Sequence, residues 1–156
     1  MALSYSVSDT FKLIVSKDDS IDHEKSDYEL YAKTLDESHL VFIKDTEPTR
    51  FVIKSRLSYQ NSELIKSKQI KMKIGGESEF NIGYVLDEVR YSLIDIENPS
   101  YLKEDQKIKF EKDKDGYASK DLITKLEQIG IIYEITNARA NISSSTSKTE
   151  DLKKKS

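Results

Sequence analysis

Residues 40–53 read LVFIKDTEPTRFVI, and this stretch decides the predicted fold. Its two ends, 40–43 and 50–53, are rich in β-branched and aromatic residues, which are enriched in strands. The polar loop between them, 44–49, contains Pro48, which has no N–H to donate to a ladder and favours a turn. The pattern predicts an antiparallel β-hairpin that runs from residue 40 to residue 53.

Strand-like segments also lie on either side of this hairpin. Residues 11–15 (FKLIV) form a compact apolar run of the kind that favours a strand. Residues 107–110 (KIKF) alternate between basic and apolar side chains, which indicates a short edge strand. The sequence therefore predicts a small antiparallel sheet that includes the hairpin.

Two helices are predicted in the first half of the chain. Residues 26–29 (SDYE) match the S-x-x-E capping box, which opens a short helix over about 27–35. The second helix is predicted over 58–74, because a run this long that is followed by Gly75-Gly76 is typical of a left-handed glycine cap. Its second half, 70–74, alternates with period two, so a strand is the alternative there.

Two further helices are predicted in the second half. Apolar residues recur at steps of three and four from Ile82 to Ile96, which predicts a long helix that ends at Asn98-Pro99 and lies at the centre of the core. The last helix opens at Ser119, and its apolar positions continue to Ile135. The predicted class is α+β, with a small antiparallel sheet or hairpin packed against three to four helices.

The length and composition predict one domain. A chain of 156 residues is long enough to bury one core. Residues 1–10 are predicted to be a flexible N-terminus, and residues 11–141 to be a single α+β domain. Residues 142–156 are rich in serine and lysine and contain few apolar residues, which predicts a disordered C-terminal tail.

The charge pattern argues against several classes of function. The 28 acidic and 25 basic residues are spread along the chain and give a net charge of −3, without the basic stripe of a nucleic-acid-binding protein. No apolar stretch approaches the roughly twenty residues that cross a bilayer, and the first ten residues do not have the pattern of a signal peptide. The chain has no cysteine, so it has no disulfide, thiolate metal site or cysteine nucleophile. We expect a cytoplasmic protein that binds neither nucleic acid nor membranes.

The acidic segment 111–116 (EKDKDG) is the strongest candidate for a metal site. It begins like a calcium loop, which has oxygen ligands at positions 1, 3 and 5 and glycine at position 6. Position 12 of that loop requires a bidentate glutamate, and this position is occupied by Leu122. The better interpretation is a charged turn that precedes a helix.

Other chemical sites have less support from the sequence. His23 and His39 are sixteen residues apart and do not provide the three closely spaced ligands of a zinc or iron site. Gly75-Gly76 is followed by acidic residues, which would repel a phosphate. No serine lies in a Gly-x-Ser-x-Gly elbow. We therefore predict no catalytic residue, no cofactor and no metal.

The aromatic residues suggest a surface that binds protein. The chain has nine tyrosines and no tryptophan, and tyrosine is enriched at protein interfaces. The predicted interface residues are Tyr59, Tyr84, Tyr91, Tyr101 and Tyr117. The alternative, left open by the sequence, is that they are boundary residues of a small core.

Four segments carry a resemblance to a known group of proteins. They are PTRFVIK at 48–54, YSLIDIEN at 91–98, IKF at 108–110 and LEQIGIIYEI at 126–135. In this order, the pattern resembles the small proteins encoded among the head and tail genes of tailed bacteriophages, some of which are tail-assembly chaperones or minor structural proteins. The resemblance covers residues 40 to 140, and the first forty residues and the C-terminal tail have no counterpart in it.

The resemblance implies a non-enzymatic protein of phage assembly. Such a protein docks onto other phage structural proteins, in several copies, in the host cytoplasm or in the virion. The alternative is an intracellular adaptor or regulatory domain that binds one soluble protein. A third possibility is a calcium-dependent or other small enzyme, which depends on segment 111–116.

Overall fold

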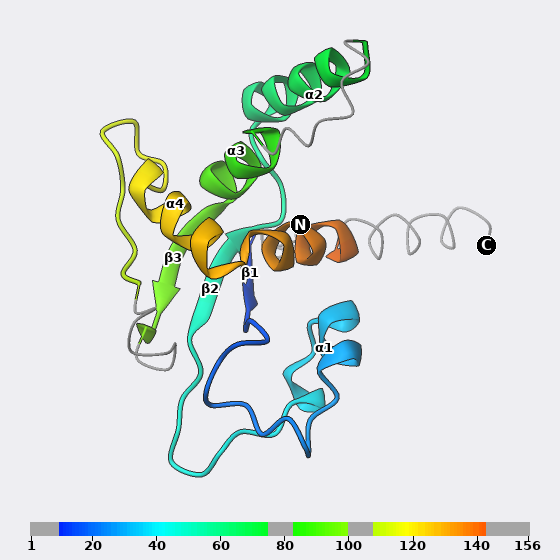
Figure 1. The fold of residues 1–156 in the computed structure, drawn as a ribbon, viewed down its shortest axis with the longest axis vertical. Helices are drawn as coiled ribbons and strands as arrows, with labels where there is room; N and C mark the ends of the chain where they lie inside the picture. The colour runs from blue at the N-terminus through cyan, green and yellow to red at the C-terminus, as the bar shows by residue number, and fades with distance from the viewer. Residues whose placement is uncertain (1–9, 75–82, 100–107, 143–156) are drawn as a thin grey trace, which may run out of the picture.

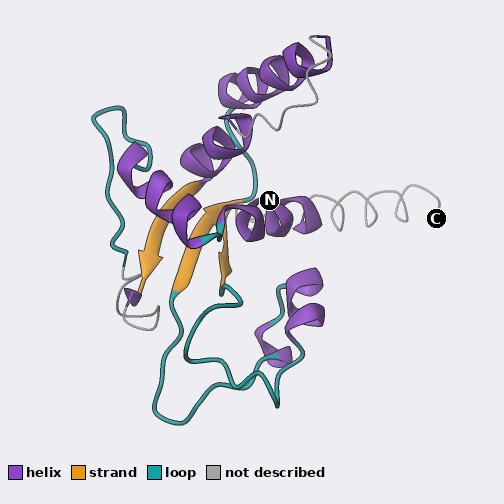
Figure 2. Cartoon of the chain, in the orientation of Figure 1, coloured by secondary structure: helices purple, strands orange, loops and turns teal. Residues whose placement is uncertain are grey.

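The computed structural model describes residues 10–74, 83–99 and 108–142 (Figure 1). A three-stranded antiparallel sheet lies at its centre, with the strand order β1-β2-β3 (Figure 2). The bounds of the strands are Thr10–Leu13 for β1, Arg50–Lys54 for β2 and Leu93–Glu97 for β3. The middle strand is therefore paired with partners that are about forty residues away along the chain on each side.

One face of this sheet forms the core. Phe51 and Ile53 of β2 are fully buried, and Leu93 and Ile96 of β3 lie beside them. Alternate strand residues point to opposite sides of the sheet, so the remaining strand residues form the opposite face, which is more polar. On that face Val52 lies between Lys12 of β1 and Asp95 of β3, both of which are exposed.

Helices cover the buried face and extend beyond the ends of the sheet. The helices are α1 (Tyr28–Thr34), the 3-10 helix η2 (Glu37–His39), α2 (Tyr59–Ile74), α3 (Gly83–Ser92) and α4 (Lys120–Ile129), followed by helical residues 132–142. In Figure 1, α2 extends away from the sheet at one end, and α1 lies toward the opposite end. The predicted α+β class is confirmed.

The last predicted helix is divided into two by a glycine. It begins as predicted, because the Ser119 side chain accepts a hydrogen bond from Leu122 N. It ends at Gly130, whose φ of 81° is a left-handed conformation that favours glycine. Lys17 Nζ donates to the carbonyl of Ile129, so a positive charge lies at the C-terminal end of the helix dipole. The prediction of one continuous helix to Ile135 was therefore wrong.

The predicted hairpin was also wrong. Residues 40–43 are not a strand of the sheet, and Phe42 instead forms an isolated antiparallel bridge with Ile21. β2 pairs with β1 and β3, where Phe51 and Ile53 are buried on a common face. Burial of these two side chains between β1 and β3 favours pairing with the distant strands, and the entropy of closing a loop grows only slowly with its length.

The helix predicted over 82–96 changes to a strand at residue 93. α3 ends at Ser92, whose hydroxyl donates to Val89 O, and β3 begins at the next residue. The β-branched Ile94 and Ile96 favour a strand, and Ile96 pairs with Phe51. Tertiary pairing thus overrides the helical spacing of the apolar residues.

Smaller differences concern caps and ends. The N-cap of α1 is Asp27, which accepts from Leu30 N, whereas Ser26 exchanges hydrogen bonds with the backbone of Val41.

Residues 108–110 are not in a strand, so the predicted edge strand is wrong over these residues, and residue 107 lies outside the described part. The predicted helix over 58–74 is confirmed as α2. The predicted glycine cap at 75–76 and the predicted tail beyond residue 142 lie outside the described residues, and the predicted flexible N-terminus overlaps β1 at Thr10.

Replacing Tyr31 with phenylalanine is expected to lower the free energy of unfolding by about 1 kcal/mol. The Tyr31 hydroxyl accepts a hydrogen bond of 2.8 Å from Ile14 N, and both residues are fully buried. Phenylalanine fills the same space but leaves this N–H without an acceptor. Urea denaturation measures the change, and Tyr59→Phe is the matched control because Tyr59 is 79% exposed. Equal midpoints for the two variants would contradict a stabilising role of this hydrogen bond.

Candidate functional site

The tyrosines of the predicted interface lie in different environments. Tyr59 is 79% exposed at the start of α2. Tyr84 is half-buried and packs against the core. Tyr91 and Tyr117 contact each other edge to face, with ring centroids 4.8 Å apart. Tyr101 lies outside the described residues. Of the described members, Tyr59 is the one with a largely free ring.

The acidic segment 111–116 is bound by an arginine of α3. Arg90 is 8% exposed, and its Nη2 lies 2.5 Å from Asp115 Oδ2 and 3.2 Å from Asp113 Oδ2. Its Nε donates to the carbonyl of Ala118 at 3.0 Å. The guanidinium holds the pKa of the Asp115 carboxyl below its ordinary value. Asp113 and Asp115, which would occupy ligand positions of a calcium loop, thus form hydrogen bonds with Arg90.

The same arginine connects this turn to two helices. Its guanidinium lies 5.9 Å from the ring centroid of Tyr91 and 5.8 Å from that of Tyr117, within the range of cation–π attraction. The hydroxyl of Tyr117 accepts a hydrogen bond of 3.0 Å from the Asn61 amide of α2. The turn, α2 and α3 are therefore held together by one polar cluster.

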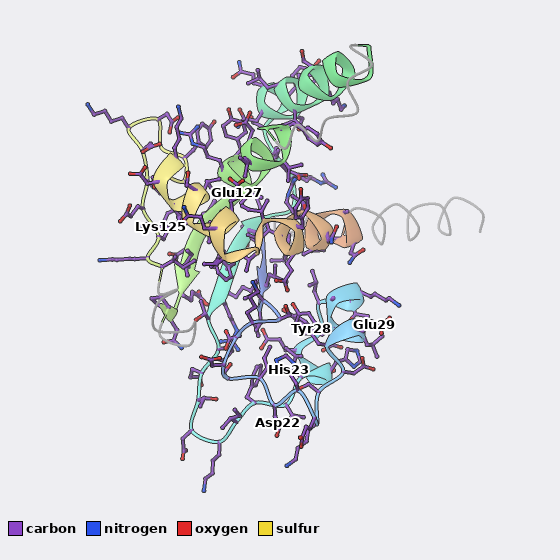
Figure 3. All side chains as sticks on the ribbon, in the orientation of Figure 1. Asp22, His23, Tyr28, Glu29, Lys125 and Glu127 are labelled. Carbon is purple, nitrogen blue, oxygen red and sulfur yellow. The ribbon has the colours of Figure 1, made fainter. Side chains whose placement is uncertain are left out.

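The histidines do not form a metal site within the described residues. His23 is exposed in the segment before α1 (Figure 3), and His39 is the last residue of η2. The neighbouring Asp22 uses its Oδ1 to accept from the backbone N–H groups of Glu24 and Lys25. Over residues 10–74, 83–99 and 108–142, no group of three or more acidic or histidine side chains has the arrangement of a metal site.

A buried carboxylate, Asp18, has a structural role. It is 1% exposed, and its Oδ1 accepts from both the N–H and the hydroxyl of Ser20, while its Oδ2 accepts from Thr49 N at 2.7 Å. Burial raises the pKa of this carboxyl, and the three hydrogen bonds oppose the rise. Because both oxygens are occupied by donors of the chain, Asp18 fixes the two loops that lead into and out of the region of α1.

A second, partly buried network contains two tyrosines. The Tyr28 hydroxyl lies 2.8 Å from Ile14 O and 3.0 Å from Glu134 Oε1, and Glu134 Oε1 also accepts from Ser16 N. Burial and the Glu134 carboxylate raise the pKa of Tyr28, and burial raises that of Tyr31 to about 12. Both phenols stay protonated at neutral pH, so they are structural hydrogen-bonding groups.

A pocket of about 230 Å³ lies where α2, α3 and helical residues 132–142 meet. Its polar part is an ion pair of Glu88 and Arg139, with Oε1 and Nη1 2.5 Å apart. Around this pair the lining residues are Leu57, Ser62, Ile65, Lys66 and Ala140. We name this feature the Arg139 pocket. The sequence does not reveal this pocket, because its two charged residues lie 51 positions apart and follow no local motif.

The Glu88–Arg139 pair is largely removed from water. Arg139 is 9% exposed, and its Nε and Nη2 also donate to the carbonyls of Lys54 and Ser55. Burial lowers the pKa of Arg139 and raises that of Glu88, while the attraction between the two charges opposes both shifts. Their mutual attraction therefore keeps the two groups charged in a partly desolvated place.

No known protein family, curated protein or solved structure matches this chain. Among the described helices, none has the length and apolar character needed to cross a bilayer.

The face of α2 beside the Arg139 pocket is the main candidate. Tyr59, Ser62 and Lys66 are spaced by three and four residues, so they lie along one side of the helix. Ser62 and Lys66 line the pocket, and Tyr59 continues the same stripe with a largely exposed ring. Leu64 is also exposed, at 50%, but it lies on the opposite side of the helix from this stripe. We name Tyr59 and the Arg139 pocket together the α2 surface.

Proposed function

We propose that this chain is a non-catalytic protein that docks onto other proteins through the α2 surface, as a structural or assembly component of a tailed phage. The observation that carries the proposal is the exposure of Tyr59, at 79%, next to the Arg139 pocket on a helix that extends away from the sheet (Figure 1). The phage setting comes from the sequence resemblance. The geometry supports docking alone.

The internal polar contacts support a docking role over a chemical one. Asp18, Arg90 and Tyr28 belong to hydrogen-bonded clusters that connect loops and helices within the chain. A catalytic group needs a free position next to a substrate. Asp18, Arg90 and Tyr28 instead contact the protein's own backbone and side chains.

The exposed aromatic ring gives the docking surface its expected anchor. Tyrosine is enriched among the residues that contribute most to binding, because it buries a large rigid ring and keeps a polar hydroxyl. Tyr59 stands beside a pocket, so a partner can cover the ring and fill the pocket at the same time. The partner is expected to be a phage structural protein present in several copies.

Cross-linking from position 59 tests this function. We expect a photoreactive phenylalanine placed at residue 59 to link the chain to phage head or tail proteins in the cells that naturally produce it. The exposed Lys125 on α4 provides the control position (Figure 3). Mass spectrometry of the linked products identifies the partner. Equal products from both positions, or none from residue 59, would contradict docking through the α2 surface, whereas one soluble non-phage partner would favour an adaptor.

Tyr59→Asp is expected to weaken binding of that partner tenfold or more without changing the unfolding temperature. The substitution places a charge in the proposed interface, but the exposed ring contributes little to folding. Retention of the variant in assembly intermediates, compared with Lys125→Asp, measures the effect. A large fall in unfolding temperature would show that residue 59 acts through the fold.

A further inference from the structure

The Arg139 pocket has the shape and charge to select one type of side chain. Its volume of about 230 Å³ is below the roughly 300–1,000 Å³ of small-molecule sites. Leu57, Ile65 and Ala140 provide apolar walls next to the Arg139 guanidinium. A single side chain with an apolar stem and a polar end is therefore the matching occupant.

The guanidinium has capacity for another acceptor. Arginine has five N–H donors, and the contacts of Arg139 to Glu88, Lys54 O and Ser55 O use three of them, the last at a long 3.5 Å. By this count, these contacts leave one N–H on each of the two terminal nitrogens unused. A carboxylate is a strong acceptor for guanidinium N–H groups.

The charge around the pocket favours an acidic partner. Among the residues that line the pocket, Lys66 and Arg139 are basic and Glu88 is acidic, which leaves an excess of one positive charge. Lys66 is paired with Glu63 at 3.8 Å, and both side chains are substantially exposed, so this pair is weak and can rearrange. An incoming carboxylate would balance the excess positive charge.

We propose that the Arg139 pocket binds a glutamate side chain from an acidic segment of the protein partner. The methylene groups contact Leu57 and Ile65, and the carboxylate accepts from Arg139 with Lys66 at the rim. This inference rests on the proposed docking function and adds the chemistry of the partner. It goes beyond Tyr59, whose ring contacts the partner outside the pocket.

Two matched peptides test the proposal: acetyl-Gly-Leu-Glu-Leu-Gly-amide and the same peptide with glutamine in place of glutamate. In titrations followed by nuclear magnetic resonance, we expect the glutamate peptide to shift the amides of Ser62, Ile65 and Ala140 and to bind roughly tenfold more tightly. Lys66→Glu should abolish this preference, and Lys125→Glu should preserve it. Both lysines are exposed, so both variants are expected to fold.

Three results would overturn the pocket inference. They are equal binding of both peptides, binding of neither, and an unchanged preference in Lys66→Glu. Displacement of the peptide by a second copy of the chain, or pocket shifts caused by Glu150→Gln in the chain's own C-terminal segment, would also replace the partner with another occupant. In each case, cross-linking from residue 59 to a phage protein would still support the docking function, so the two proposals fail separately.

Discussion

Replacing Arg139 with methionine is expected to lower the free energy of unfolding at pH 7 by about 3 kcal/mol. The substitution keeps an apolar stem of similar length but leaves Glu88 without its counter-charge in a partly desolvated place. It also removes the donor to the carbonyl of Lys54 at the end of β2. Chemical denaturation measures the loss, and Arg56→Met is the control because Arg56 is an exposed cation in the adjoining segment.

The pH dependence of this variant distinguishes an unpaired carboxylate from lost packing. Burial already raises the pKa of Glu88, and removing the guanidinium raises it further. A carboxyl whose pKa is higher in the folded state than in the unfolded state binds protons more readily when folded, so folding gains stability as pH falls through the folded pKa toward the unfolded one. The difference between wild type and Arg139→Met should therefore shrink from pH 7 to pH 4.5. A difference that stays constant would assign the loss to packing.

The sequence predicted the individual elements better than their pairing. The predicted strands at 11–15 and 50–53 and the predicted helix at 58–74 correspond to β1, β2 and α2, although β1 ends at Leu13 and α2 begins at Tyr59. Their residue types and periodicity act locally, within one strand or helix. The choice of partner for β2 depends on which distant segments bury Phe51 and Ile53, and this choice cannot be read from a short loop. The hairpin from 40 to 53 failed for this reason.

Two local features of the sequence indicate the observed structure against the predicted helices. Gly130 lies inside an otherwise helical pattern, and it ends α4 in a left-handed conformation. Residues 93–97 (LIDIE) contain β-branched side chains in alternation, which favours the strand that is found there. Residues 93–97 and Gly130 also fit the helical spacing of the apolar residues. Pairing with β2 determines the strand at 93–97, and the contact of Lys17 with Ile129 O helps to determine the end of α4 at Gly130.

The candidate site was predictable only in part. Tyr59 was selected from composition, and the structure places its ring at the surface. The Glu88–Arg139 and Arg90–Asp115 pairs join residues that are 51 and 25 positions apart, with no spacing rule that relates them. Segment 111–116 resembles a calcium loop when it is considered alone. Its counter-charge, Arg90, lies in α3, and this partner is not visible from the local sequence.

Replacing Arg90 with methionine is expected to lower the free energy of unfolding by about 2 kcal/mol. The change removes the buried donor to the carbonyl of Ala118 and leaves Asp113 and Asp115 as neighbouring like charges. The turn before α4 then loses its hydrogen bonds to Arg90 of α3, while the Tyr91–Tyr117 contact remains and the apolar stem of methionine still fills part of the space. Urea denaturation measures the loss of stability.

Arg50→Met is the matched control for this prediction. Arg50 also contacts a carboxylate through two nitrogens, with Nη2 2.8 Å from Glu37 Oε1, but the pair lies nearer to the surface, with side chains 24% and 37% exposed. Such a pair is worth about 1 kcal/mol or less, so Arg50→Met should destabilise less than Arg90→Met. Added salt should weaken the Arg50 pair more, because water and ions reach it more easily. Equal losses of stability and equal responses to salt would show that Arg90 does not hold the acidic turn through a buried contact. The turn would then be fixed by its own backbone hydrogen bonds, such as the one from Asp113 N to Tyr117 O.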